Sequence, residues 1–351
     1  MELHTITTLK QAAAGGRIEA KIHAQIELLA RKETREGKPF FEVVLTDAEA
    51  RLTLRAWSDG PAFPFCKGLA AGAFLEVTGE FSAESNYGLD SKRWTCRELT
   101  RDERDALLAG PASLREKQTA DVVFIENMAR AIRDPRLRAL ALLFLNDHGD
   151  RFRRAAAARG NHHARRGGLV EHVAQMLRSG DAISSAYPGL NRDLLLAGIV
   201  FHDAGKLWEN GLPADGFTMP FDERGELLGH ITIGIELVNG LWRRMLATDE
   251  ARSWGDLEPA SEDVRLHLLH LIAAHHGELQ FGSPTPPKTP EAWALHYIDN
   301  LDAKLEMLAA GYASARKVAA RIHERVRPLP GNFVSPLGVF RSRTDSAPAA
   351  N

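Results

Sequence analysis

From about Arg17 to Leu99, apolar and polar positions alternate with a period of two. Apolar residues occupy every second position at the start of this region (Ile18, Ala20, Ile22, Ala24 and Ile26). This alternation is typical of a strand with one buried face. Similar patterns predict further strands at 40–46, 51–57 and 73–81, and a fifth at 89–98. Short strands without a helix of comparable length predict a small all-β barrel.

The order of these strands resembles an OB-fold of the nucleic-acid-binding kind. A long first strand is followed by Gly37–Phe41 (GKPFF), an apolar strand ending in Leu45–Asp47 (LTD), and a strand ending in Trp57. In such folds aromatic side chains stack on bases while basic side chains follow the backbone. The candidates for these contacts are Lys38, Phe41, Arg55 and Trp57. Alternatively, Phe41 and Trp57 belong to the barrel core, and since Phe40 and Phe41 point to opposite faces, at most one of these two is core.

From about residue 120 the apolar period changes to that of helices and keeps it to about residue 326. Helices are expected at 121–132, 135–146, 169–178, 193–201, 227–245 and 262–274, and from 290 onwards. Asn191 and Ser261 are expected to cap two of them. The chain is therefore expected to be multi-domain: a barrel at 1–100, a polar linker at 101–118, an all-α helical bundle at 119–330, and a tail at 331–351 that is disordered at its end.

Composition limits the remaining possibilities. The chain has 351 residues and a formal net charge of -2, so a nucleic-acid surface must come from local clusters of basic residues. Neither of the two cysteines has zinc-site spacing, which argues against thiolate sites and a disulfide framework. The start of the chain lacks the pattern of a signal peptide, and no apolar run is long enough to span a membrane. We therefore expect a cytoplasmic protein with no membrane partner.

The most informative stretch is Ile199–Glu209 (IVFHDAGKLWE), where an apolar helix leads directly into His202 and Asp203. Neighbouring residues on a helix point about 100° apart, so both side chains reach one cation only at the last turn, where the backbone loosens. The spacing therefore suits a metal site. The alternative is a His-Asp pair on the surface ahead of a glycine cap.

Further histidines and an aspartate lie inside or at the ends of apolar helices. The full candidate set is His172, His202, Asp203, His230, His275, His276 and Asp299. Each residue taken alone is readily explained as an ordinary core or surface side chain. Buried imidazoles cost free energy unless they have partners, so convergence on a divalent metal explains the set as a whole.

Six arginines lie between residues 151 and 166, in a segment that also contains His162 and His163. Charge runs of this kind often form solvated helix faces. The competing interpretation is a phosphate-binding lip, in which His162, His163 and Arg166 contact an anionic chain.

These residues resemble the HD-domain metal-dependent phosphohydrolases, whose signature is a His, then His-Asp, then a distant Asp. The resemblance is closest to the YhaM-type 3′-to-5′ exoribonucleases, which carry an OB-fold ahead of the HD domain. It rests on His162–Ala164 (HHA), Arg166–His172 (RGGLVEH), Leu190–Gly198 (LNRDLLLAG), His202–Lys206 (HDAGK), Leu228–His230 (LGH), Ala274–Glu278 (AHHGE), Phe281–Pro284 (FGSP) and Ile298–Lys304 (IDNLDAK).

The resemblance implies one or two divalent ions, with Mn favoured and Fe, Co or Zn as alternatives. The first ion would be held by His172, His202, Asp203 and Asp299. The second would be held by His230, His275 and His276 with Asp203 bridging, or one of the last two histidines contacts substrate instead. Asp203 and Lys206 would act in catalysis, with Lys206 on the scissile phosphate; the alternative for Lys206 is a surface pair with Glu209.

Three further residues have expected roles. Asp302 is expected to act through Lys304 or as a partner of a ligand, and Glu171 either orients a ligand histidine or is exposed. Arg165 stands where the resemblance predicts an aromatic residue, which leaves the local substrate contact open.

The leading hypothesis is a metal-dependent 3′-to-5′ exonuclease of single-stranded RNA, with single-stranded DNA as a second substrate. One alternative is an HD phosphohydrolase of small nucleotides with a regulatory OB domain, and another is a non-catalytic RNA-binding protein. The direction of attack comes from the resemblance alone, and the sequence does not predict an oligomeric state.

Overall fold

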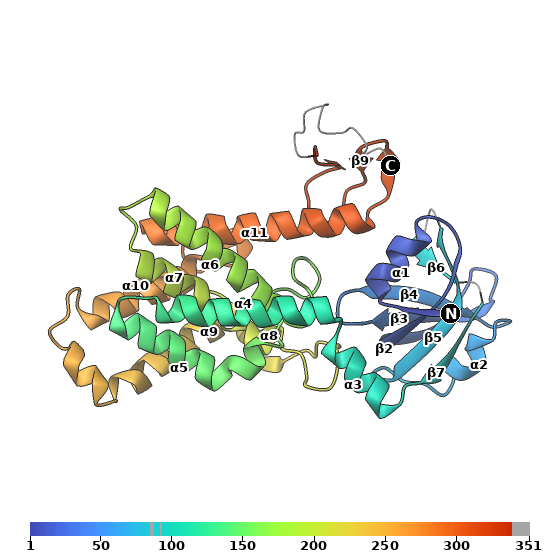
Figure 1. Cartoon of the computed structure of the whole chain (residues 1–351), viewed down its shortest axis with the longest axis horizontal. Coiled ribbons are helices and arrows are strands. Elements are labelled where there is room, and N and C mark those ends of the chain that lie inside the picture. Colours follow the sequence, from blue (N-terminus) through green and yellow to red (C-terminus); the bar gives the residue numbers. More distant parts are fainter. Residues whose placement is uncertain (85–87, 92, 339–351) are drawn as a thin grey trace, which may run out of the picture. The chain divides into compact units, whose positions relative to one another are not determined.

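A computed structural model of the chain describes residues 1–84, 88–91 and 93–338 (Figure 1). It divides into two compact units, Met1–Ala303 and Lys304–Asn351. The first unit starts with a sheet-rich region and continues as a bundle of helices. No helix in the described part of the chain is long and apolar enough to cross a membrane.

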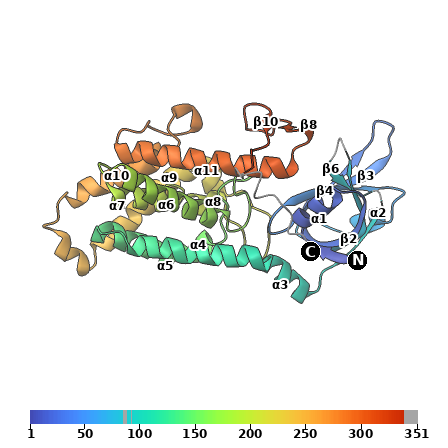
Figure 2. The ribbon, with the colours of Figure 1, turned by 45° about the horizontal axis from the view of Figure 1, so that its top comes forward.

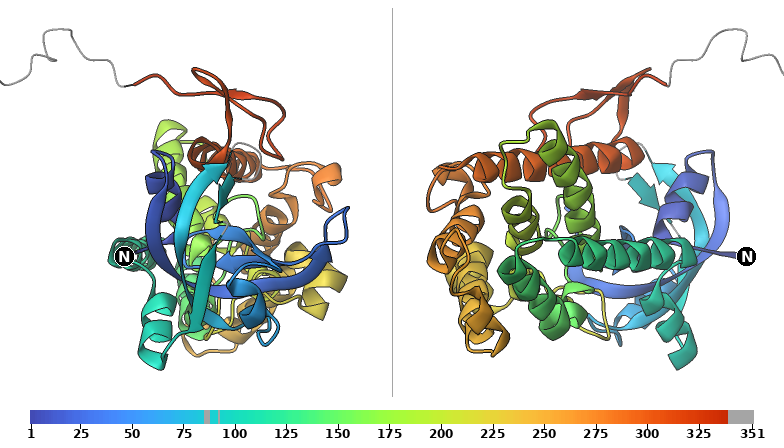
Figure 3. Two further views of the ribbon diagram at one scale, coloured as in Figure 1. Left: turned by 90° about the vertical axis from the view of Figure 1, so that its right-hand side faces the viewer. Right: turned by 60° about the vertical axis from the view of Figure 1, so that its left-hand side comes forward.

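The sheet of the first unit is built around one long curved strand, β2 (Figure 3). Its strands are β1 (Glu2–His4), β2 (Ile18–Glu33), β3 (Pro39–Thr46), β4 (Arg51–Trp57), β5 (Phe74–Glu84), β6 (Gly88–Asp90) and β7 (Trp94–Glu98). The ladder runs β4-β3-β2-β5-β6, with β7 antiparallel to β5 and β1 parallel to β2. This path is open across the described strands, so the closed barrel that the sequence predicts is not seen.

The period-two pattern correctly predicts the buried face of β2. Ala20, Ile22, Ala24 and Ile26 have no solvent exposure and form a core with α1 (Ile6–Ala13) and α2 (Ala62–Cys66). The period-two pattern does not predict these two short helices. It also merged β6 and β7 into one strand at 89–98.

Helices form the rest of the first unit, and the last of them continues into the second unit (Figure 2). They are α3 (Arg101–Ala109), α4 (Ala112–Arg130), α5 (Pro135–Phe152), α6 (Gly168–Ala186), α7 (Arg192–Phe201), α8 (Lys206–Glu209), α9 (Glu223–Leu246), α10 (Ser261–Ala274) and α11 (Pro290–Ser314), with short 3₁₀ turns at Glu250–Trp254 and Leu279–Phe281. Helix α7 is central because it packs against α4, α5, α6 and α10. Every residue from 194 to 201 is buried, as its apolar sequence requires.

Several predicted boundaries differ from the structure. The segment 101–118, expected to be a linker, forms α3 and the beginning of α4, because Thr100 and Glu103 cap α3 reciprocally. Ser261 does not cap α10; its hydroxyl instead accepts a hydrogen bond from Arg136. The backbone N–H of Phe217 donates to Gln25, which links the helical part of the first unit to β2.

The second unit contains the end of α11 and a small sheet with the order β10-β9-β8. These strands are β8 (Lys317–Ala319), β9 (Ile322–His323) and β10 (Phe333–Val334). Helices were expected up to residue 326, so β8 and β9 correct that prediction, and β10 lies in the predicted tail. The expectation of disorder at the end of the tail, 342–351, falls outside the described residues.

Candidate metal centre

The end of α7 places His202 and Asp203 at the centre of the bundle. Asn191 begins the helix by accepting a hydrogen bond from the backbone N–H of Leu194, as the sequence predicts. Leu271 of α10 packs so closely that a Cβ at Gly198 would lie 2.3 Å from its Cδ2. Helix α7 ends at Phe201 with His202 as its C-cap, and both His202 and Asp203 are buried.

Three side chains, those of His172, His202 and Asp299, meet on one side of Asp203. The Nε2 atoms of His172 and His202 lie 3.3 Å apart. His172 Nε2 is also 3.3 Å from Asp299 Oδ1, and His202 Nε2 is 3.2 Å from Asp203 Oδ2. These residues come from α6, the end of α7 and α11, so a bundle of distant segments assembles the group predicted for a first ion.

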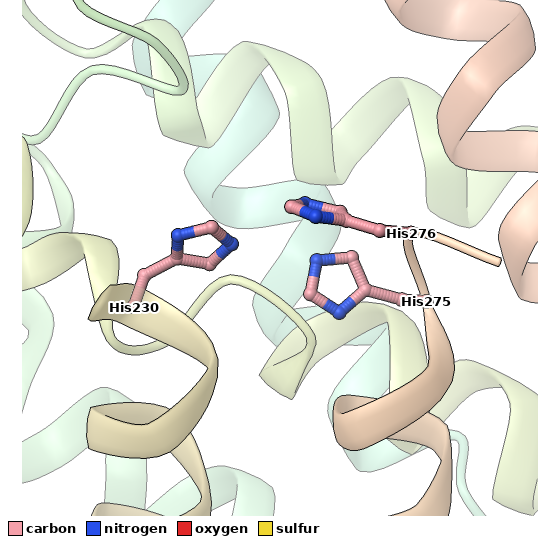
Figure 4. Close-up of side chains that lie close together, drawn as sticks. All are labelled: His230, His275 and His276. Carbon is pink, nitrogen blue, oxygen red and sulfur yellow. The ribbon is translucent and has the colours of Figure 1, made fainter. Parts of the chain in front are cut away.

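Three histidines, His230, His275 and His276, form a second group (Figure 4). His230 comes from α9, while His275 and His276 follow α10, and their ligand atoms lie within 4.8 Å of one another. Asp203 Oδ1 is 3.6 Å from His230 Nε2 and 3.7 Å from His275 Nε2. Asp203 therefore presents one oxygen to each group.

All five imidazoles are oriented through their Nδ1 atoms. Nδ1 contacts a backbone carbonyl in three of them: His202 with Ile199 (2.8 Å), His275 with Ile272 (2.7 Å) and His276 with Phe281 (2.7 Å). It contacts a carboxylate in the other two: His172 with Asp302 (2.7 Å) and His230 with Glu209 (2.6 Å). These acceptors hold the proton on Nδ1 and leave the Nε2 lone pair for a cation.

The donor set fits a pair of divalent cations. Within the described part of the chain, His230 Nε2 and His275 Nε2 are buried without a hydrogen-bond partner. Buried polar atoms of this kind are costly unless something binds them. Mixed imidazole and carboxylate ligation suits Mn, Fe, Co or Zn better than Mg, which prefers oxygen ligands.

Residues 169–304 match the family model of the HD domain. This region is similar to an HD domain. It contains all seven predicted ligands, from His172 to Asp299. HD domains are metal-dependent hydrolases that bind divalent metals, and the match therefore indicates a metal-dependent phosphohydrolase.

The charged groups around Asp203 shift one another's pKa values. Burial opposes ionisation of Asp203, yet the neighbouring His202 and Lys206 hold its pKa well below the usual range. Burial and then the charge of His276 lower the pKa of His275, which favours the neutral form that ligates metal. For His172 burial acts in the same direction, but Asp299 and Asp302 outweigh it and raise the pKa to about 9. A cation bound there would displace that proton.

Helix α8 brings two charged side chains to this centre from one turn. Lys206 is buried, with Nζ 2.7 Å from Asp203 Oδ2, so the alternative of a surface pair with Glu209 is wrong. Glu209, three residues later, contacts His230; the sequence analysis missed this role. The backbones of α8 and α9 approach so closely that a Cβ at Gly205 would lie 1.9 Å from His230 O.

The residues predicted to grip substrate have varied surroundings. The His162 ring lies 5.5 Å from that of His172, and His163 Nε2 lies 3.0 Å from Asp302 Oδ2. The Arg166 guanidinium donates to the carbonyls of Pro213, Ala214 and Gly216. Arg166 thus holds the loop 213–216, and its contact with substrate stays a prediction.

The predictions for Asp302 and Glu171 have different outcomes. Asp302 contacts His172 and His163, so it is a partner of a predicted ligand. Glu171 is buried and accepts hydrogen bonds from Arg165 and Gln118, so neither expectation for this residue holds. At the position where an aromatic residue was expected, Arg165 instead pairs with Glu171. This pair joins the segment that precedes α6 to the helix itself.

The strands β3 and β4 present an aromatic pair at the surface of the sheet. Phe40 and Trp57 are only partly buried, their ring centroids lie 4.9 Å apart, and Lys38 Nζ lies 5.8 Å from the Trp57 ring. Phe41 is instead buried against Phe63, which makes its predicted nucleic-acid contact wrong. The alternation required one of the two phenylalanines to face outward, but it did not say which. Phe40 is the residue that the sequence analysis missed.

Arg55, the fourth residue predicted to contact nucleic acid, lies on β4 and is partly buried. Its NH1 is 3.8 Å from Asp90 Oδ2. Its contact with nucleic acid stays a prediction.

Proposed function

We propose that the protein is a metal-dependent 3′-to-5′ exonuclease of single-stranded RNA, with single-stranded DNA as a second substrate. The observation that carries this proposal is the convergence of five imidazoles and two carboxylates around Asp203. When bound, two divalent cations, for which we favour Mn, would supply a lower pKa for water and neutralise charge on a phosphodiester. The direction of attack rests on the family resemblance.

Each residue of the centre has a separate role in this proposal. Asp203 bridges the two groups of histidines, and Asp299 completes the first group. Lys206 adds a buried positive charge beside Asp203, where it can neutralise charge that develops on the phosphate. His162 and His163 would contact the incoming strand next to His172.

The sheet-rich region would bind the strand ahead of the scissile bond. We propose that it is an OB-fold, in which Phe40 and Trp57 stack on bases and Lys38 contacts phosphate. The Trp94 indole N–H donates to the Arg55 carbonyl at 3.1 Å, which joins β7 to β4 although the two strands are not neighbours in the ladder. This contact between distant strands supports the OB-fold proposal.

The test is digestion of single-stranded RNA with a label at either end, in the presence of Mn. We expect a 5′-labelled strand to give a ladder that shortens with time, and a 3′-labelled strand to release labelled mononucleotide at once. The reverse pattern would overturn the direction. Hydrolysis of free nucleotides beside an intact oligomer would instead favour the small-nucleotide phosphohydrolase. Metal-independent RNA binding without hydrolysis would favour the non-catalytic alternative.

A further inference from the structure

We infer that Glu209 is a positioning residue that selectively sets the affinity of the second ion, the one assigned to His230, His275 and His276. This inference rests on the metal centre of the proposed function. Glu209 acts through His230 and is not itself a ligand.

One carboxylate oxygen of Glu209 holds His230 at two points. Oε2 accepts hydrogen bonds from the backbone N–H at 3.0 Å and from the ring Nδ1 at 2.6 Å. The two contacts orient both the first residue after the bend at Gly229 and its side chain. His230 Nε2 is then directed at Asp203 Oδ1, 3.6 Å away.

The surrounding backbone fixes the position of His230 relative to Glu209. Gly229 has φ 67° and interrupts α9, so His230 begins a new helical segment whose first N–H groups need acceptors. A Cβ at Gly225 would lie 3.1 Å from the Glu209 Cα, so α9 packs directly on the residue that supplies the carboxylate.

Only two of the five imidazoles have a carboxylate on Nδ1, and they belong to different ions. Asp302 contacts His172 of the first group, and Glu209 contacts His230 of the second. A carboxylate makes the imidazole a more basic ligand than a carbonyl does. Each ion therefore has one such histidine, and loss of one carboxylate should weaken one ion only.

A purely structural role for Glu209 makes a different prediction. If Glu209 served only to join α8 to α9, its replacement would lower stability and weaken both ions together. The readout that separates the two roles is therefore the affinity of each ion, measured without substrate.

The experiment is equilibrium dialysis of the chelator-treated full chain against Mn²⁺ alone. We expect two ions per chain in the wild type. In Glu209→Gln we expect the second ion to bind about 10- to 100-fold more weakly, while the first changes less than about twofold. Asp302→Asn should show the opposite pattern. Glu226→Gln, which changes an exposed glutamate in the first turn of α9, the helix that carries His230, is the matched control and should bind like the wild type.

Further variants keep the test decisive. His230→Ala should lose the second ion. The double variant His230→Ala/Glu209→Gln should differ from His230→Ala in Mn²⁺ binding by less than about twofold. If circular dichroism shows that Glu209→Gln is unfolded, Glu209→Asp, which retains the charge at a shorter reach, is measured in the same way and should weaken only the second ion. Equal affinities in wild type and Glu209→Gln, equal weakening of both ions, or a single ion in the wild type would each overturn the inference. Failure of the RNA digest with two ions bound would contradict the proposed function alone.

Discussion

His172 and His202 face each other through their Nε2 atoms at 3.3 Å, and each has its Nδ1 held by an acceptor elsewhere. Two imidazole lone pairs at this distance repel each other unless a proton or a cation lies between them. Asp299 and Asp203 add negative charge to the same space. The pair is thus arranged to bind a positively charged species.

Replacing the bridging carboxylate should remove both metal binding and hydrolysis. In Asp203→Asn each group of histidines loses its shared anionic oxygen. We expect Mn affinity to fall by more than about 100-fold, beyond the usual effect of an outer partner, and RNA hydrolysis to be lost while RNA binding is largely retained. Dialysis measures Mn affinity, digestion of labelled RNA measures hydrolysis, and filter binding measures RNA affinity, with the exposed Asp256→Asn as control. Full activity in Asp203→Asn would refute the assignment.

Lys206 should matter for turnover and not for metal retention. Its ammonium lies beside Asp203, so it opposes cation binding while it can neutralise phosphate charge. We expect Lys206→Gln to lower kcat for RNA by about 100-fold, with Mn affinity equal to or higher than that of the wild type. Lys288→Gln, on an exposed residue, is the control. Loss of metal in Lys206→Gln would show that the lysine supports the site structurally instead.

Phe40 and Phe41 should separate binding from stability although they are neighbours. Phe41→Ala empties a core position and should cost about 3–5 kcal/mol of unfolding free energy. Phe40→Ala should cost only about 1 kcal/mol yet weaken binding of single-stranded RNA, as should Trp57→Ala, by about tenfold each. Urea unfolding and fluorescence anisotropy measure the two quantities. Unchanged RNA affinity in both surface variants would contradict the stacking role.

A buried ion pair far from the centre should make stability depend on pH. Arg136 is almost fully buried and pairs with Asp134 at 2.7 Å. Burial opposes ionisation of Asp134, but the hydrogen bond from Arg136 outweighs it and lowers the pKa. A carboxyl with a lowered pKa in the folded state adds stability above its unfolded pKa of about 4 and loses it as the pH falls further.

Asp134→Asn tests this pair because asparagine can still cap α5. We expect a loss of about 2 kcal/mol at pH 7, which shrinks as the pH falls below about 4, measured by urea unfolding at several pH values. A difference between the two proteins that does not change with pH would assign the loss to the cap or to packing.

The sequence predicted best what depends on local periodicity. The alternation around Ile22 located β2 and its buried face, and the apolar run before His202 located the end of α7. The predicted ligands are brought together by long-range packing, which the sequence suggested only through the clustering of residue types and the family resemblance.

Other features depended on contacts between distant segments that no local pattern carries. The choice between Phe40 and Phe41 required the position of Phe63. The role of Glu209 required the approach of α9, because by spacing alone it looked like a partner for Lys206. Polar composition suggested a linker at 101–118, whereas a reciprocal cap at Thr100 was enough to start a helix there.

Gly205 offers no functional group, yet the position is as restrictive as that of a ligand, because a Cβ there would lie 1.9 Å from His230 O. Even alanine at this position would push the start of the second segment of α9 outward and carry the imidazole with it. In a mutational scan, substitution of Gly205 should therefore reduce metal retention about as much as substitution of the ligand histidines and aspartates. The absence of a side chain at Gly205 is therefore required for the position of the His230 ligand.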